Sequence, residues 1–171
     1  LFMGRLTRLK GCDLLVDALP LASAALGRRL VMVVAGAGPE EGRLRAQAAR
    51  NSVPADFRGW VGRGDAVALF RSVDAIAVPS VWPEPFGLVG IEAGAAGVPA
   101  VGFAVGGIPE WLLPGRTGEL APSPPTSAGL AEALVRALAA RDRHHALRMG
   151  AWESAHGYGL AQHAQRLVTI L

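Results

Sequence analysis

The sequence lacks the features of a disulfide-stabilised secreted protein and of a membrane-spanning protein. It contains one cysteine, Cys12, in 171 residues. A single cysteine excludes an internal disulfide and favours a reducing compartment. No apolar run approaches the roughly 18 residues that cross a bilayer, and the first residues do not have the pattern of a cleavable signal. We therefore expect a cytoplasmic protein and find no sign of membrane association in this segment.

Charged residues are also scarce, at 18% of the chain, with a net charge of +3. Lys10 is the single lysine among 17 basic residues, and the arginines are scattered singly or in pairs. Nucleic-acid binding requires a clustered basic surface, so we expect no nucleic-acid partner. Hydrophobic residues make up 51% of the chain, which excludes disorder and indicates a folded domain with a substantial core.

Strand-like and helix-like segments alternate along the first two thirds of the chain. Nearly continuous apolar runs, typical of strands covered on both faces, are followed by amphipathic patterns. This alternation predicts an α/β fold with a doubly wound, Rossmann-like parallel sheet. The expected strands are 1–3, 30–35, 74–79 and 99–103, with a further short strand in 57–62 that leads into a glycine-rich loop. The expected helices are 13–26, 39–50, 65–72 and 86–96.

The last third of the chain predicts a helical C-terminal segment. Apart from a short strand at 118–121, we expect helices at 127–140 and 160–171. The proline-rich stretch at 122–125, which precedes these helices, is too short for a domain linker, so residues 1–171 are interpreted as one domain. Pro20 interrupts the first helical pattern, and we expect it to kink that helix away from the preceding loop.

In an open parallel sheet, ligands bind at the carboxyl ends of the strands. The first loop at that edge begins at Gly4 and carries Arg5 and Lys10. A planar guanidinium and a point-charge ammonium suit a diphosphate. Taken alone, the same residues are explained more simply as two solvated loop cations.

The second loop near the expected ligand side contains several glycines. Residues 36–38 resemble part of a dinucleotide-binding fingerprint, but the next glycine comes one residue late and no acidic residue follows the next strand. This loop is therefore interpreted as a strand-to-helix turn near the ligand, with Pro39 in the first turn of the helix.

The third loop contains Trp60 and Val61. Its backbone is suited to pairing with the edge of a nucleobase, whereas the simpler interpretation packs the indole over the end of the sheet. In the loop that follows the strand at 99–103, Glu110 is expected to have a structural role.

The stretch PEPFGLVGIE places two carboxylates, Glu84 and Glu92, eight positions apart in an otherwise apolar segment. A helix starting at Phe86 would present the amides of residues 86–88 as unpaired first-turn donors. Eight helical residues span about 12 Å. Two carboxylates at this separation fit the two hydroxyl-bearing rings of one ligand, because carboxylates accept hydrogen bonds from hydroxyls.

Together, GRLTRLKGCDLLVDAL, VVAGAGPEEGRL, VPSVWPEPFGLVGIEAGAAGVPAVGFAVGGIPEWL and GRTGELAPS resemble the C-terminal half of retaining, family-4-type glycosyltransferases, the glycosyl transferases group 1. The similarity runs along nearly the whole chain. It implies one half of a GT-B fold, that is, a nucleotide-sugar-binding domain without the N-terminal acceptor domain. It also implies transfer of a glycosyl group with retention by the full-length enzyme, which we expect in the cytoplasm or at the inner face of the membrane.

The resemblance also assigns roles to residues. Glu92 would hold the ribose, and Glu84 the donor sugar close to the reacting centre. Arg5 and Lys10 would bind the diphosphate and stabilise charge on the leaving group. The remaining donor-binding residues would be Gly4, Phe86, Gly87 and Leu88 around the phosphate and sugar, and Trp60 and Val61 at the base. No Asp-x-Asp sequence occurs, so we expect no metal and no cofactor, with a UDP-, GDP- or ADP-linked sugar as donor.

Two other functions stay open at this point. A sugar-nucleotide epimerase shares the two-domain fold but needs further acid–base groups, and the four histidines all fall in the C-terminal helical region. A binding-only module with a degenerate site is disfavoured because every expected charged position is occupied. We expect the isolated chain to transfer no sugar.

Overall fold

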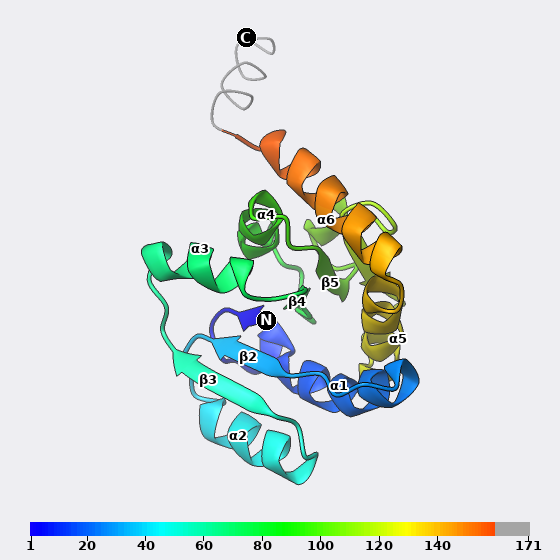
Figure 1. The fold of residues 1–171 in the computed structure, drawn as a ribbon. Helices are drawn as coiled ribbons and strands as arrows, with labels where there is room; N and C mark the ends of the chain where they lie inside the picture. The colour runs from blue at the N-terminus through cyan, green and yellow to red at the C-terminus, as the bar shows by residue number, and fades with distance from the viewer. Residues whose placement is uncertain (160–171) are drawn as a thin grey trace.

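The computed structural model describes residues 1–159 and contains one parallel sheet in the order β3-β2-β1-β4-β5-β6 (Figure 1). The order reverses between β1 and β4, as in a doubly wound sheet. All five pairings are parallel. This confirms the predicted fold class. The strands are β1 (Phe2–Met3), β2 (Met32–Ala35), β3 (Ala55–Gly59), β4 (Ile76–Val78), β5 (Ala100–Phe103) and β6 (Gly118–Ala121).

Helices cover both faces of this sheet. Figure 1 shows α1 and α2 on one side and α3 and α4 on the other. α5 packs on α1, and α6 contacts both α4 and α5. The helices are α1 (Cys12–Leu26), α2 (Glu41–Arg50), α3 (Arg63–Arg71), α4 (Leu88–Ala95), α5 (Ser127–Leu138) and α6 (Arg141–His156), with short 3-10 turns η1 (Arg8–Lys10) and η2 (Ile108–Glu110).

Two hydrophobic clusters, one on each face, hold these layers together. One joins α1, α2 and α5 to the sheet, and the other joins α3, α4 and η2 to it. β4 and β5 are buried along their whole length, as their apolar sequences predict. Within residues 1–159, no helix is both long and apolar enough to span a bilayer.

The helix that contains Pro20 is continuous, and the kink expected there stays a prediction. α1 runs from Cys12 to Leu26 with Pro20 inside it. A proline removes one backbone hydrogen bond and costs about 3 kcal/mol in a helix interior. α1 buries a face that includes Leu15, Val16 and Leu19 against the core, and this burial offsets the cost.

Other predicted boundaries also shift. β3 begins at Ala55, two residues before the expected start, and Trp60 and Val61 lie in the loop after it, as expected. α2 begins at Glu41 with Glu40 as N-cap, which places Pro39 before the helix rather than in its first turn. α6 had been predicted only as part of a helical region, and the expected helix at 160–171 lies outside the described residues.

Trp111 fixes the position of α4 beneath the ligand-facing edge of the sheet. Its indole N–H donates to the carbonyl of Phe86 at 2.5 Å, and its ring lies against Gly90. A Cβ at Gly90 would lie 2.0 Å from the ring, so this position has no room for a side chain. The start of α4 therefore depends on a glycine packed on a buried tryptophan.

We expect Gly90→Ala to lower the free energy of unfolding by about 1–3 kcal/mol, because the methyl group overpacks against Trp111. The matched control is Gly42→Ala in α2, where a Cβ meets nothing within 4 Å. There the gain in helix propensity should stabilise the chain by a few tenths to about 1 kcal/mol. Urea denaturation of both variants measures the contrast, and equal effects at the two positions would contradict the packing argument.

Candidate functional site

A cavity of about 220 Å³ lies at the carboxyl ends of β1 and β4, where the strand order reverses. This is the place where doubly wound sheets bind ligands. Its polar and backbone lining comes from the loops after these two strands and from the start of α4. The lining includes Gly4, Arg5, Lys10, Ser80, Glu84 and Leu88.

The loop after β1 is held by the loop after β2. The amide of Gly4 donates to the carbonyl of Ala35 at 2.9 Å, and that of Leu6 donates to Ala37 at 3.0 Å. A Cβ at Gly38 would lie 2.3 Å from the Leu6 carbonyl oxygen, so only glycine permits this approach. The glycines at 36–38 thus form a turn near the site, and their neighbour is the loop that carries Arg5.

Lys10 reaches the site because η1 packs against the end of β4. Gly11 follows Lys10 with φ of 63°, and a Cβ there would lie 1.9 Å from the carbonyl oxygen of Pro79. The amide of Val81 donates to the carbonyl of Leu9 at 3.0 Å. These contacts join two segments that are about seventy residues apart in the sequence.

The centre of the site is an ion pair between Lys10 and Glu84. Lys10 Nζ lies 2.5 Å from Glu84 Oε2, and the hydroxyl of Ser80 donates to the same oxygen at 3.0 Å. Ser80 is buried and was not identified from the sequence. Its position directly after a buried strand was the one available signal, because that is where ligand-side residues are expected.

Glu84 is held ionised although it is buried. Burial opposes the charged form, but the hydrogen bonds from Lys10 and Ser80 and the charge of the ammonium outweigh it, so the pKa of Glu84 lies below its ordinary value. The backbone of Glu84 is fixed as well, since its carbonyl accepts the amide of Gly107 at 2.8 Å. Glu110 is exposed and is not part of the cavity lining.

The start of α4 differs from the prediction. Gly87, with φ of 77°, is the N-cap, so the first helical residue is Leu88 instead of Phe86. The amide of Gly90 already donates to the Gly87 carbonyl at 3.0 Å. Within residues 1–159, the amides of Leu88 and Val89 make no backbone hydrogen bond and are the free donors of the first turn.

Phe86 was predicted to contact the ligand, but it does not line the cavity. Its ring packs edge-on against Tyr158 with centroids 5.7 Å apart, and its carbonyl is occupied by Trp111. Gly87 and Leu88 do line the cavity. The helix begins only after Gly87, which has a left-handed conformation. The free first-turn amides are therefore those of Leu88 and Val89 instead of the predicted three at 86–88.

The four charged groups predicted to converge do so in part. Arg5, Lys10 and Glu84 line one cavity, whereas Glu92 lies one turn into α4, is exposed and does not line it. Among the described residues, Arg5 has no ion-pair partner. A ligand that contacts all four groups would have to extend from the cavity along the outside of α4.

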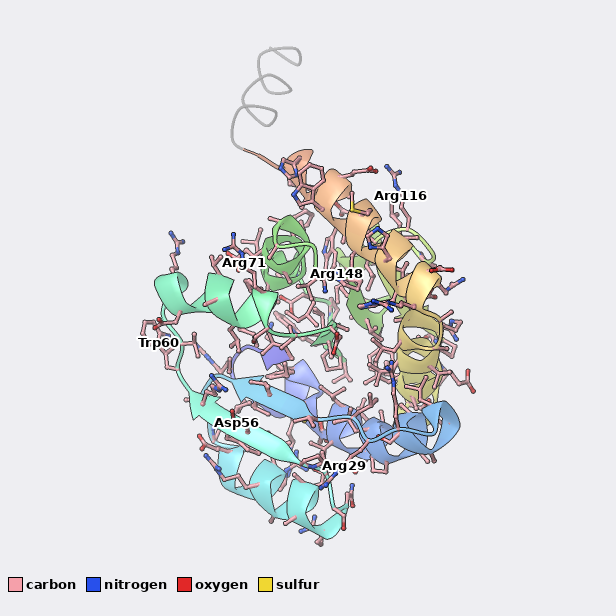
Figure 2. All side chains as sticks on the ribbon, viewed as in Figure 1. Arg29, Asp56, Trp60, Arg71, Arg116 and Arg148 are labelled. Carbon is pink, nitrogen blue, oxygen red and sulfur yellow. The ribbon has the colours of Figure 1, made fainter. Side chains whose placement is uncertain are left out.

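Trp60 projects from the loop between β3 and α3 and is 82% exposed (Figure 2). This excludes the interpretation in which the indole packs over the end of the sheet. Trp60 and Val61 line a second, open cavity of about 530 Å³ together with Arg58 and Asp65. This second cavity does not share lining residues with the first.

No histidine lines the first cavity among residues 1–159. His144 lies 2.8 Å from the carbonyl of Asp74, and His156 contacts the carbonyl of Trp152 in its own helix. His145 is exposed, and His163 lies outside the described residues. Residues 1–159 also contain no group of three or more His, Cys, Asp or Glu side chains arranged to hold a metal ion, and the expectation of a metal-free reaction stays a prediction.

Sequence comparison identifies the family. The sequence model described as glycosyl transferases group 1 matches residues 1–152. D-inositol 3-phosphate glycosyltransferase of Actinosynnema mirum is 38% identical over 168 residues, covering 92% of this chain and 40% of the relative. Phosphatidyl-myo-inositol mannosyltransferase of Mycobacterium leprae is 37% identical over 139 residues, covering 81% of this chain and 36% of the relative. The chain therefore spans about two fifths of these curated relatives.

Solved structures agree with the fold. Anabaena HepE, solved in complex with UDP and glucose, superposes with a TM-score of 0.86 at 24% identity, over 99% of this chain and 47% of that one. The catalytic domain of cholesterol-alpha-glucosyltransferase from Helicobacter pylori gives 0.80 at 18% identity, over 92% of this chain and 96% of that one. At these identities the likeness establishes the fold.

We expect Lys10→Met to lower the free energy of unfolding at pH 7 by about 1–3 kcal/mol, because it leaves a buried carboxylate without its cation. A depressed folded pKa gives stability that is present above the unfolded pKa of about 4.3 and is lost as the pH falls through the folded value. The difference between parent and variant should therefore shrink below about pH 4. Urea denaturation at several pH values measures it.

The control for this variant is Arg45→Met, which breaks the exposed pair with Glu41 at 2.8 Å. An exposed pair of this kind contributes about 0.3–0.5 kcal/mol. A loss at Lys10 no larger than that at Arg45, or one that does not change with pH, would contradict the assignment of Glu84 as a buried anion.

Proposed function

This chain belongs to the glycosyl transferases group 1, and we propose that it binds the nucleotide-sugar donor of a glycosyltransferase. The observation that carries the proposal is the Lys10–Glu84 ion pair in a cavity at the reversal point of the sheet. Such a cavity combines a cation, a carboxylate and the free amides of a helix start. Phosphate, sugar hydroxyls and a diphosphate bridge are the groups that this set of donors and acceptors suits.

The cavity is suited to the middle of such a donor. Arg5 and Lys10 contact the diphosphate, together with the amides of Leu88 and Val89 at the positive end of the α4 dipole. Both contacts of Glu84 involve Oε2, and among residues 1–159 none involves Oε1. That second oxygen is available to accept a sugar hydroxyl near the reacting centre.

The nucleoside extends outside the cavity. A volume of about 220 Å³ is below the range of about 300–1,000 Å³ that encloses a drug-sized ligand. Glu92 on the exposed side of α4 holds the ribose, and the loop of Trp60 and Val61 receives the base. UDP is the first nucleotide to test, because HepE was solved with UDP and glucose.

The whole protein transfers the glycosyl group to an acceptor and keeps the anomeric configuration. The cations and the start of α4 stabilise the departing diphosphate electrostatically without a metal. Since the chain spans 40% of the Actinosynnema relative, the acceptor site and the facing wall of the cleft belong to another domain of the same protein.

We expect the chain to bind UDP, and we expect Arg5→Ala and Glu92→Gln each to weaken binding about tenfold by removing a charged hydrogen-bonding group. Isothermal titration calorimetry measures this. Arg29→Ala is the control, because Arg29 precedes β2 at the opposite edge of the sheet (Figure 2). Failure to bind UDP, GDP or ADP would contradict the proposed function. Binding that neither variant alters would contradict the site.

The epimerase is distinguished by its product. We expect NMR spectra of UDP-glucose incubated with the chain to show the unchanged sugar, because no histidine and no second acid–base pair lines the described cavity. A second hexose with its own anomeric signal would favour epimerisation, and release of free glucose would show water acting as acceptor.

A further inference from the structure

Trp82 lies beside the Lys10–Glu84 pair and has an unpaired buried donor. Its indole nitrogen is buried and has no hydrogen-bond partner within residues 1–159. A buried N–H without a partner is destabilising, and such groups are rare in folded proteins. Trp82 is two residues from Glu84 in the sequence and does not line the cavity.

The indole is close to both members of the ion pair. Lys10 Nζ lies 5.8 Å from the centroid of the Trp82 ring, within the range of a cation–π contact. Trp82 also contributes to the lowered pKa of Glu84, although within residues 1–159 its indole N–H has no hydrogen-bond partner. Oε2 of Glu84 already accepts hydrogen bonds from Lys10 and Ser80.

A phosphate ligand changes the hydrogen bonding of Glu84. Lys10 lines the cavity, and its ammonium has one hydrogen bond to Glu84 in the ligand-free chain. When the ammonium turns towards a phosphate, Glu84 loses its strongest donor while it remains buried. A buried carboxylate needs a replacement, and the indole N–H of Trp82, two residues away in the sequence, is a buried donor without a partner within residues 1–159.

We propose that Trp82 is a positioning residue whose indole N–H replaces Lys10 on Glu84 when Lys10 turns to the phosphate of the ligand. This proposal rests on the proposed function, because it requires a phosphate at Lys10. The exchange keeps Glu84 ionised and oriented while Lys10 becomes available. The ring of Trp82 meanwhile stays near the lysine side chain.

The test is Trp82→Phe, which keeps an aromatic ring and removes the N–H. In the ligand-free chain this donor is unpaired, so the variant should be as stable as the parent or more stable. Its affinity for UDP should fall about three- to tenfold, since a hydrogen bond to a charged group is lost in the bound state. Its affinity for uridine, which has no phosphate, should not change. Calorimetry and thermal denaturation measure these three quantities.

The matched control is Trp152→Phe on α6, where the indole is 46% exposed and packs edge-on against His156. It should bind UDP and uridine as the parent does. If Trp82→Phe is destabilised and weakens UDP and uridine alike, Trp82 has a merely structural role and the proposal is wrong. Unchanged UDP affinity in that variant also overturns it. A parent chain that binds no UDP overturns the proposed function first, and the exchange with it.

A second measurement reports the exchange directly. In nitrogen-15 NMR spectra, the indole signal that disappears in Trp82→Phe identifies Trp82. On addition of UDP its proton should move downfield as it bonds to the carboxylate, and addition of uridine should leave it in place. The shift should be lost in Glu84→Gln, which has no charged acceptor. An indole signal that does not respond to UDP while UDP binds would contradict the proposal.

Discussion

The ion pair between Lys10 and Glu84 joins the two strand ends between which the sheet reverses its order. The loop after β1 contributes the cation, and the loop after β4 contributes the carboxylate. The helices that follow these two strands, α1 and α4, pack on opposite faces of the sheet, and the cavity lies between the two loops. The position of Arg5, the start of α4 and the cavity itself all depend on these two loops being held at contact distance.

Backbone contacts, rather than side chains, set that distance. A Cβ at Gly11 would lie 1.9 Å from the Pro79 carbonyl oxygen, one at Gly36 would lie 1.9 Å from that of Gly4, and one at Gly106 would lie 2.1 Å from that of Glu84. Each of these glycines has a positive φ. The backbone of the site is therefore closely packed, and the proposed exchange between Lys10 and Trp82 requires only side chains to move.

The sequence predicted the fold well because periodicity reports burial, and burial on both faces is what a parallel sheet requires. It predicted Arg5, Lys10 and Glu84 in one hollow because the ends of parallel strands lie at one edge. It did not predict the start of α4 at Leu88, since Trp111, more than twenty residues away, fixes the conformation before it. Ser80 was missed for the same reason, because its role arises from its hydrogen bond to Glu84. Trp82 was missed as well, since an indole N–H that is buried without a partner within residues 1–159 can be recognised only in the structure.

Stability alone does not explain why an ionised pair occupies this position. Removing two charges from water costs several kcal/mol for each ion, and a well-packed apolar pair of similar volume is often as stable or more so. Here the side chain of Glu84 is 11% exposed and that of Lys10 is 29% exposed, so the carboxylate bears most of this cost. In the proposed function the charges are useful when a ligand arrives: an ammonium that is already desolvated and oriented loses little further freedom on meeting a phosphate. The same preorganisation makes the partner exchange at Glu84 necessary. A carboxylate that is this buried has little access to water, so water does not replace the hydrogen bond that Lys10 withdraws.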